Sequence, residues 1–426
     1  MDSYKYTTFA NFCQNKDTIA TTCNCLVCGN LCKRHSIASR KVRDISLEGD
    51  ATFVVQVGVY FCRTCNKYFR INPSFVTKGK HYSNRVLEKN YSGIVEDKTT
   101  FTAIPKRLKR DFNVSPSKST CYRWFHSQAK KIDLADSYTP WVAKNFSGVM
   151  AIDEVYDGYA VFFATDPVAK TTLGYHLCES ATREELESFL LRLKGFGVEP
   201  KVLIRDGAPI YRHIPKKIWP KLRLQLCTFH VIRLYQKLVI DTLREYRKTL
   251  LKSSRKKDCS DPNELKNDVK LMWKYRYAFA TRFEKLKPEK QEVLNYLAKK
   301  YMHLKVLLCF EKDLLNLFSR NQTKEEMEKR RNHFLINEWY QWDKHLSKAV
   351  NFVRSIYFLE AVEFMNHENL DSTSNSVERA NRWFRKRQKT HYRNRKAETI
   401  TNMLNADLMR QMELKKPSLL VQAEVA

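Results

Sequence analysis

The chain has 426 residues, of which 76 are lysine or arginine and 46 are aspartate or glutamate. The resulting charge of +30 favours a polyanionic partner, DNA or RNA, over the alternative of a soluble protein that is merely basic. No apolar run is long enough to span a membrane, and the N-terminus lacks the apolar region of a signal peptide. Twelve cysteines without such a signal argue against a disulfide scaffold and for a reducing cytoplasm.

Two Cys-x2-Cys pairs lie in the amino-terminal region, Cys25 with Cys28 and Cys62 with Cys65. Thiolates two residues apart across a tight turn can reach one ion, and two such pairs complete a tetrahedral zinc shell. A β-branched and aromatic run leads into the second pair, so we predict a zinc ribbon with a structural Zn²⁺ over residues 1–80. The alternative is two unrelated pairs of buried thiols. Three neighbouring side chains are rival ligands: Cys23, Cys32 and His35.

Residues 81–135 are predicted to form a helical domain that binds DNA. Helical periodicity covers 82–94, 102–114 and 118–126, with a turn before the third pattern. Ser115 is the predicted N-cap of the third helix, and the proline that follows it would be the first helical residue.

This order of helix, turn and helix is typical of a helix-turn-helix, in which the second of these helices reads DNA. An ordinary three-helix linker domain is the alternative. Cys121, Trp124 and Phe125 are predicted to pack inward. The residues predicted to face the DNA groove are Ser117, Lys118, Thr120 and Arg123.

From residue 148 onward the pattern changes to strands. Runs at 149–152, 160–165 and 171–177 predict an antiparallel meander. A helix should follow, with Thr182 as the N-cap of a capping box and Gly195 as the glycine just past its end.

Two more strands are predicted, one ending at Asp206 and one over 222–227. Three strands, a helix, a strand, a connection and a strand is the order of the ribonuclease H-like fold. We therefore predict such a core over 146–240, with a mixed five-stranded sheet. Placing the first and fourth strands side by side would bring Asp153 and Asp206 to a common edge.

Three carboxylates could hold a pair of divalent cations. Asp153 and Asp206 each close an apolar run, and Glu378 stands near the start of an arginine-rich helix. Hard oxygen ligands suit two Mg²⁺ or Mn²⁺ ions, and in a basic chain the natural substrate is a nucleic acid phosphodiester. The ordinary alternatives are a solvated strand end or turn for each aspartate, and a capping box with Asn375 for the glutamate. Rival carboxylates are Asp157, Asp166 and Glu154, the last expected on the opposite sheet face from Asp153.

The helix of Glu378 is assigned to the last part of the core, 370–412, which a tail over 413–426 follows. Asn375 should cap this helix, and its packing face should consist of Val377, Ala380 and Phe384. Its basic side chains are predicted to grip DNA phosphates, and they are Arg379, Arg382, Arg385, Lys386 and Lys389.

Between the two parts of the core, residues 241–369 read as helical throughout. Helix starts are expected at Asp261 and at Thr323. Cys227 and His230 could bind a metal with a partner from this insertion, but we favour a buried pair that supports the strand. The possible partners are His303 and Cys309.

Together these residues resemble a prokaryotic insertion-sequence transposase of the DDE type, most closely the ISL-three group. The architecture is similar over nearly the whole chain, although each motif is short. The matching motifs are Asp153-Glu154-x-Tyr156, Arg205-Asp206-Gly207, Cys227-x2-His230, and Glu378 with basic residues four and seven positions later.

The resemblance implies a multidomain α+β protein whose ribonuclease H-like core is split by an all-helical insertion. It also implies dependence on Mg²⁺ or Mn²⁺, recognition of terminal inverted repeats, and strand cleavage followed by joining to target DNA. Cutting two ends together implies a homodimer or larger assembly on double-stranded DNA, near the nucleoid of a prokaryotic cytoplasm. In some relatives an aromatic residue of the insertion stacks on a displaced base. The candidates are Trp273, Trp339 and Trp342, for which ordinary core packing is the favoured alternative.

Two other functions remain open at this stage. The first is a DNA-binding regulator derived from a transposase, with a silent core. The second is a structure-selective ribonuclease H-like nuclease, which would not need to recognise the ends of an element.

Overall fold

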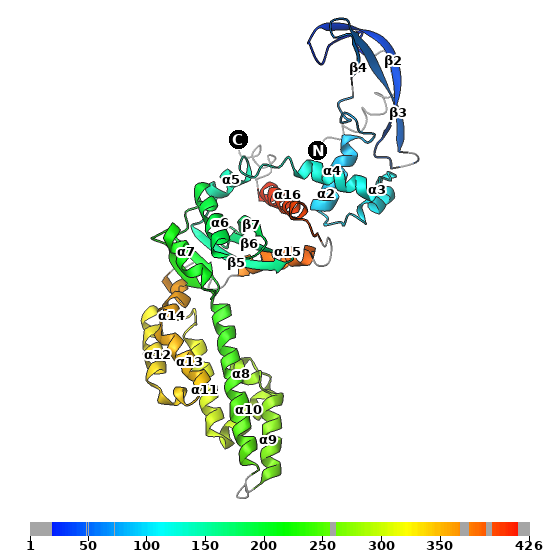
Figure 1. Ribbon diagram of the computed structural model, residues 1–426. Coiled ribbons are helices and arrows are strands. Elements are labelled where there is room, and N and C mark those ends of the chain that lie inside the picture. The colour runs from blue at the N-terminus through cyan, green and yellow to red at the C-terminus, as the bar shows by residue number, and fades with distance from the viewer. Residues whose placement is uncertain are drawn as a thin grey trace, which may run out of the picture. The chain divides into compact units, whose positions relative to one another are not determined.

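The computed structural model describes residues 19–47, 49, 51–71, 73–255, 261–366, 375–388 and 394–415. The chain divides into two compact units, whose elements Figure 1 labels. Unit one comprises Met1–Tyr138 and Lys386–Ala426, and unit two comprises Thr139–Arg385. The predicted last segment of the core is thus divided between the two units, and the six predicted domain bounds stay predictions. One predicted DNA-binding residue, Lys389, lies outside the described residues.

Unit one begins with a four-stranded antiparallel sheet in the order β1-β2-β3-β4. The predicted run that leads into the second cysteine pair is β3, and its alternating side chains place Val55 and Val57 in a small core with Val42 and Val76. The strands are β1 (Thr22–Asn24), β2 (Leu31–Arg43), β3 (Thr52–Cys62) and β4 (Lys67–Arg70).

Three helices follow the sheet: α2 (Asn84–Val95), α3 (Ile104–Phe112) and α4 (Lys118–Ala129). The three predicted helical patterns are therefore present, and the turn after α3 uses Asn113 with a left-handed φ of 55°. The predicted cap at Ser115 is wrong. Ser117 is the N-cap of α4, because its side chain accepts a hydrogen bond from the backbone N–H of Thr120 and satisfies a donor that the helix start leaves open.

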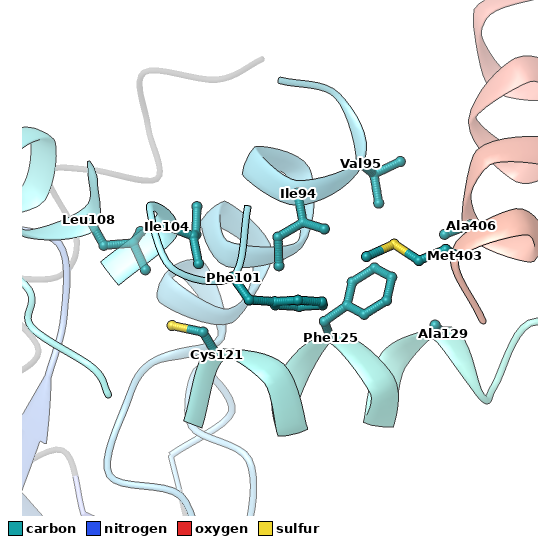
Figure 2. Packing of buried hydrophobic residues seen from close by; sticks show 10 residues of the cluster. All are labelled: Ile94, Val95, Phe101, Ile104, Leu108, Cys121, Phe125, Ala129, Met403 and Ala406. Carbon is teal, nitrogen blue, oxygen red and sulfur yellow. The ribbon is translucent and has the colours of Figure 1, made fainter. Parts of the chain in front are cut away.

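The C-terminal helix α16 (Ala397–Lys415) packs against these N-terminal helices. Figure 2 shows Met403 and Ala406 of α16 next to Phe125 and Ala129 of α4, in one apolar cluster. Buried polar contacts add to this cluster, since Asn402 Nδ2 lies 2.8 Å from His126 Nδ1. Hydrophobic burial at this contact therefore joins the two ends of the chain into one unit.

Unit two contains a mixed five-stranded sheet in the order β7-β6-β5-β8-β9, of which Figure 1 labels β5, β6 and β7. The first three strands form the predicted antiparallel meander, and β8 runs parallel to both β5 and β9. The predicted pairing of the first and fourth strands is confirmed. The strands are β5 (Val149–Asp157), β6 (Tyr159–Asp166), β7 (Thr171–Cys178), β8 (Val202–Arg205) and β9 (Arg223–Leu226).

Three helices flank the strands in sequence: α5 (Tyr138–Lys144), α6 (Arg183–Gly195) and α7 (Ile210–Ile218). Thr182 caps α6 as predicted, with its side chain accepting from the N–H of Glu185. Gly195 is not the glycine beyond the helix end. The helix includes it, and the residue with the left-handed backbone is Gly197, at φ 86°.

The insertion is helical in its described part and begins directly after β9. Asp261 and Thr323 cap their helices as predicted, the latter with a complete capping box. The helices are α8 (Thr228–Ser253), α9 (Pro262–Lys274), α10 (Pro288–Lys300), α11 (Met302–Asn316), α12 (Lys324–Ile336), α13 (Lys344–Arg354) and α14 (Ile356–Ala361). Four 3-10 turns join them: η2 (Ala278–Ala280), η3 (Phe283–Lys285), η4 (Glu338–Gln341) and η5 (Glu363–Asn366).

The insertion returns to the sheet through buried polar contacts. Arg205 of β8 forms an ion pair with Glu360 of α14, and both side chains are largely buried. Gln225 of β9 donates to the carbonyl of Ala361 at 3.1 Å and accepts from the N–H of Phe364 at 2.6 Å. Buried polar groups of this kind are costly unless paired, so these contacts fix where the chain re-enters the core.

The three insertion tryptophans lie in different surroundings. Trp342 packs inside against His303 and Tyr246, as the core alternative predicts. Trp273 has the guanidinium groups of Arg247 and Arg276 within 4.5 and 4.6 Å of its ring centre. For Trp339 core packing is wrong, because 57% of this residue is exposed.

Candidate active site

The two predicted aspartates follow the same paired positions of neighbouring parallel strands. Ala151 of β5 pairs with Ile204 of β8; Asp153 lies two residues further along β5, and Asp206 lies two residues after Ile204, just beyond the end of β8. Paired parallel strands lie about 4.8 Å apart, so the register places these two carboxylates side by side at the end of β8. Asp206 Oδ1 accepts from the N–H of Ala208 at 2.8 Å, which holds the turn after the strand.

Helix α15 (Asn375–Lys386) packs on the sheet through its buried face. Ser376 Oγ lies 2.9 Å from Thr165 Oγ1, and the ring of Phe384 lies 5.8 Å from that of Phe163 on β6. Figure 1 shows α15 running beside the strands. The predicted cap, Asn375, is the first residue of this helix.

The buried face of α15 differs in part from the predicted one. Val377 and Phe384 are buried as expected, but the other two buried residues are Ser376 and Asn381, and Ala380 is only partly buried. The physical reason is a polar contact, because Asn381 Nδ2 donates a 2.7 Å hydrogen bond to Oδ2 of Asp153. The amide oxygen of Asn381 is also buried, and it has no hydrogen-bond partner within the described part of the chain.

Glu378 stands one helical turn before Asn381 and lies next to the start of α8. Its carboxylate, the thiol of Cys227 and an imidazole nitrogen of His230 all lie within 4.8 Å of one another. Glu378 is therefore held close to the sheet, on the same helix as the residue that touches Asp153.

Burial and neighbouring charge shape the protonation of this site. The pKa of Asp153 is raised to about 7, first by burial and then by the negative charges of Glu154 and Asp206. The pKa of His230 is raised to about 9, mainly by its hydrogen bond with Cys227, with smaller contributions from Asp206 and Asp153. The carboxylates of Asp153, Glu154 and Asp206 thus repel one another, and the charge of His230 partly offsets this repulsion at Asp153.

Two of the rival carboxylates have other roles. Glu154 accepts a hydrogen bond from the Tyr211 hydroxyl of α7, on the sheet face opposite to that of Asp153, as strand alternation predicts. Asp166 is buried and accepts from the N–H groups of Val168 and Ala169 and from both the N–H and the hydroxyl of Ser147. This carboxylate therefore stabilises a turn.

The basic residues of α15 and the one directly after it differ in exposure. Arg379, Arg382, Arg385 and Lys386 are exposed. In contrast, Arg387 is buried in unit one, where it forms an ion pair with Asp407 of α16. The exposed side chains are the ones that a phosphate backbone could reach.

In unit one the four predicted thiols come together. Cys28 Sγ lies 3.5 Å from Cys62 Sγ, Cys25 Sγ lies 4.0 Å from Cys65 Sγ, and all four sulfur atoms lie within 4.8 Å of one another. Four thiolates around Zn²⁺ at about 2.3 Å have sulfur atoms about 3.8 Å apart, so these distances fit the ion.

On α4 the residues predicted to face DNA are Lys118 and Arg123, which are exposed, Thr120, which is half-buried, and Ser117, which is exposed and caps the helix. The three residues predicted to pack inward, Cys121, Trp124 and Phe125, are buried. The inward face of the helix is thus the predicted one, and contact of the outward residues with DNA stays a prediction.

A comparison with known protein families identifies the family of this chain. A family model for ISL3-type DDE proteins, described as Transposase, matches residues 152–390, which is more than half of the chain. The chain belongs to this transposase family. The matched segment includes both aspartates, Glu378, and the whole insertion between them.

Two further comparisons complete this result. The transposase matches a chain of the Drosophila P element transposase strand transfer complex at 12% identity and a TM-score of 0.43, covering 81% of this chain and 94% of that one. No curated protein matches it. In the described part of the transposase, no helix has both the length and the apolar character that a membrane span requires.

Sequence reasoning about this transposase missed two features of the site. The third group beside Cys227 and His230 is Glu378, whereas His303, one of the two possible partners, packs against Tyr246 and Trp342. Asn381 was also missed. Its spacing of three residues after Glu378 was a signal for a shared helix face, but that face was assigned by hydrophobicity alone.

Proposed function

We propose that this transposase cuts and joins DNA at Asp153, Asp206 and Glu378, in a ribonuclease H-like core. The observation that carries the proposal is the hydrogen bond from Asn381 to Asp153. It ties the helix of Glu378 to the strand of Asp153, and the strand register sets Asp206 beside Asp153. These contacts support an arrangement in which three acidic side chains, remote in sequence, share one end of the sheet.

The donor set fits divalent metal ions. Three carboxylates are hard oxygen ligands, and the pKa of Asp153 is raised by burial and by the negative charges of Glu154 and Asp206, which a bound cation would offset. When bound, two Mg²⁺ or Mn²⁺ ions would activate the attacking oxygen and stabilise the leaving oxygen of an in-line phosphoryl transfer. Asn381 would orient Asp153, and the exposed Arg382 and Arg385 would hold the phosphates on either side of the scissile bond.

We assign end recognition to unit one. The four clustered thiols support a structural zinc ribbon, and the exposed Lys118 and Arg123 support α4 as the reading helix of a helix-turn-helix. Its ligand would be the terminal inverted repeat of a mobile element. Because both ends of an element must be cut together, the active form would be a homodimer or larger assembly on double-stranded DNA.

The test replaces Asp153 with asparagine. Asp153→Asn should abolish Mg²⁺-dependent cleavage of an end-containing duplex while binding of that duplex stays intact, measured by strand-cleavage and mobility-shift assays. Asp157→Asn, on the same strand, is the matched control and should keep cleavage. An Asp153→Asn protein that still nicks DNA would show that the carboxylates are misassigned.

The same assay separates the alternatives. A transposase-derived regulator would bind ends without strand transfer in the wild type. A structure-selective nuclease would cleave branched DNA better than inverted-repeat ends.

A further inference from the structure

A second cluster of possible metal ligands adjoins the proposed catalytic acids. Cys227 is the N-cap residue of α8, and His230 lies three residues further on the same side of the helix start. Glu378 reaches them from α15, so that one ligand atom from each residue lies within 4.8 Å of the other two. Two chain segments, the start of α8 and α15, thus converge on one point.

The chemistry of this cluster differs from that of the aspartates. A thiolate and an imidazole favour Zn²⁺ and related transition metals, whereas Mg²⁺ prefers oxygen ligands. Three protein ligands with an open fourth position are the usual donor count of an exchangeable zinc site. Cys227 is fully buried, and the Nδ1 atom of His230 is buried without a hydrogen-bond partner among the described residues.

Another cluster with the same ligand types is less suited to a metal. His176, Cys178 and Glu185 also lie within 4.8 Å of one another. Both ring nitrogens of His176 already have partners, since Nε2 lies 2.5 Å from Glu185 Oε2 and Nδ1 lies 3.3 Å from a guanidinium nitrogen of Arg192, whereas His230 Nδ1 has none among the described residues. This cluster therefore supplies a control.

We propose that Cys227, His230 and Glu378 bind Zn²⁺, and that zinc held there withdraws Glu378 from the Mg²⁺ ligand set. The binding site stands on the geometry alone. Its inhibitory effect rests on the proposed function, because it requires Glu378 to be a catalytic acid. Zinc would then keep the transposase inactive until the metal is removed.

The first test counts zinc in full-length protein. After loading and dialysis, the wild type should hold about two zinc ions per chain, one at the four thiols and one at this cluster. Cys227→Ser and Glu378→Gln should each lose about one ion, whereas Cys178→Ser should lose none. Because Glu378 is only partly buried, Glu378→Gln should disturb the fold less than a substitution of buried Cys227. Zinc loss in this variant would therefore not be due to misfolding, which far-UV circular dichroism checks. Full retention by Cys227→Ser or Glu378→Gln, or a loss in Cys178→Ser, would overturn the site.

The second test measures inhibition. Zn²⁺ titrated into the Mg²⁺-dependent cleavage assay should inhibit the wild type, and inhibition of Cys227→Ser should need about tenfold or more zinc, as expected when a ligand is removed. An unchanged zinc dependence in Cys227→Ser would contradict the inhibitory role. If zinc is bound at the cluster but leaves cleavage unaffected, the metal site stands and the catalytic role of Glu378 fails, so the two failures are distinguishable.

Discussion

Asn381 Nδ2 donates a 2.7 Å hydrogen bond to Oδ2 of Asp153, across 228 positions of the chain. The contact fixes one oxygen of the carboxylate, and the other oxygen, Oδ1, accepts from the backbone N–H of Glu154 at 3.0 Å. Because Asn381 is 3% exposed, the orientation of its amide is set by packing as well as by the hydrogen bond. A neutral donor at this place orients a buried acid without neutralising it.

Asn381→Ala should therefore impair cleavage by disordering Asp153. We expect kcat to fall by about 10- to 100-fold, the usual effect of removing a residue that orients a metal ligand, with little change in KM for DNA. Single-turnover cleavage at saturating Mg²⁺ would measure this. Asn375→Ala, at the exposed start of the same helix, is the control. Equal losses in the two variants would indicate a general effect on α15.

Asp153 should make the Mg²⁺-free protein less stable as pH rises. Its pKa is raised from 3.8 to about 7 by burial and by Glu154 and Asp206, so between about pH 4 and 7 the folded state keeps a proton that the unfolded state has lost. Stability falls through that window and stays low above it. Asp153→Asn removes the buried charge and should raise the free energy of unfolding near pH 8 by up to about 4 kcal/mol, with no gain near pH 4.

Urea denaturation without Mg²⁺, near pH 4 and near pH 8, measures this difference in the free energy of unfolding of unit two. Asp157→Asn serves as the control on the same strand. If the free energy of unfolding of Asp153→Asn changed with pH as much as that of the wild type, groups other than Asp153 would cause the pH dependence.

The cysteine cluster should be required for the fold of the N-terminal sheet. Cys62→Ser should remove about one zinc and unfold this sheet, because apparent binding energies of structural zinc are about 10–16 kcal/mol and the apolar core there is small. Cys32→Ser tests the rival ligand and should keep the ion, since Cys32 lies outside the set of four. Metal analysis and limited proteolysis report the two effects. Normal zinc content in Cys62→Ser would exclude this ligand set.

The exposed basic residues of α4 should contribute to DNA affinity. Lys118→Ala should weaken binding of all duplexes alike and lower the salt dependence by about one phosphate contact. If Arg123 contacts a base, Arg123→Ala should weaken the binding free energy by about 1–3 kcal/mol for DNA that contains the end sequence, and not for other DNA. Titrations at several salt concentrations distinguish the two. Lys299→Ala, exposed on α10, is the control. If α4 does not contact DNA, both variants should bind DNA with the same affinity as Lys299→Ala.

Local patterns predicted those parts of the fold that depend on neighbouring residues. Alternation and turns define β5 to β7, and side-chain caps define the starts of α6, α9 and α12. Both cysteine pairs follow from spacing alone. The start of α4 was placed wrongly at Ser115 because two serines competed, and only Ser117 has the geometry to accept from Thr120.

Contacts between distant segments were beyond such reasoning. Hydrophobicity assigned Ala380 to the packing face of α15, but the buried residue is Asn381, and its partner Asp153 lies on a remote strand. The packing of α16 on α4 is equally long-range, and no periodicity within α16 indicates which surface it will cover.

A long-range contact of this kind gives Arg387 a structural role that its basic sequence context does not indicate. In the sequence it is one of a run of basic residues, yet it is 7% exposed and paired with Asp407, whose carboxylate Lys98 also contacts at 3.2 Å. Asp407→Ala removes the shared acid from two cations, one of them buried, and should destabilise unit one by about 3–5 kcal/mol. Glu413→Ala, which removes a more exposed acid of the same helix, should cost less than about 1 kcal/mol. Thermal denaturation of both variants compares these costs, and similar midpoints would show that the buried pair adds no stability.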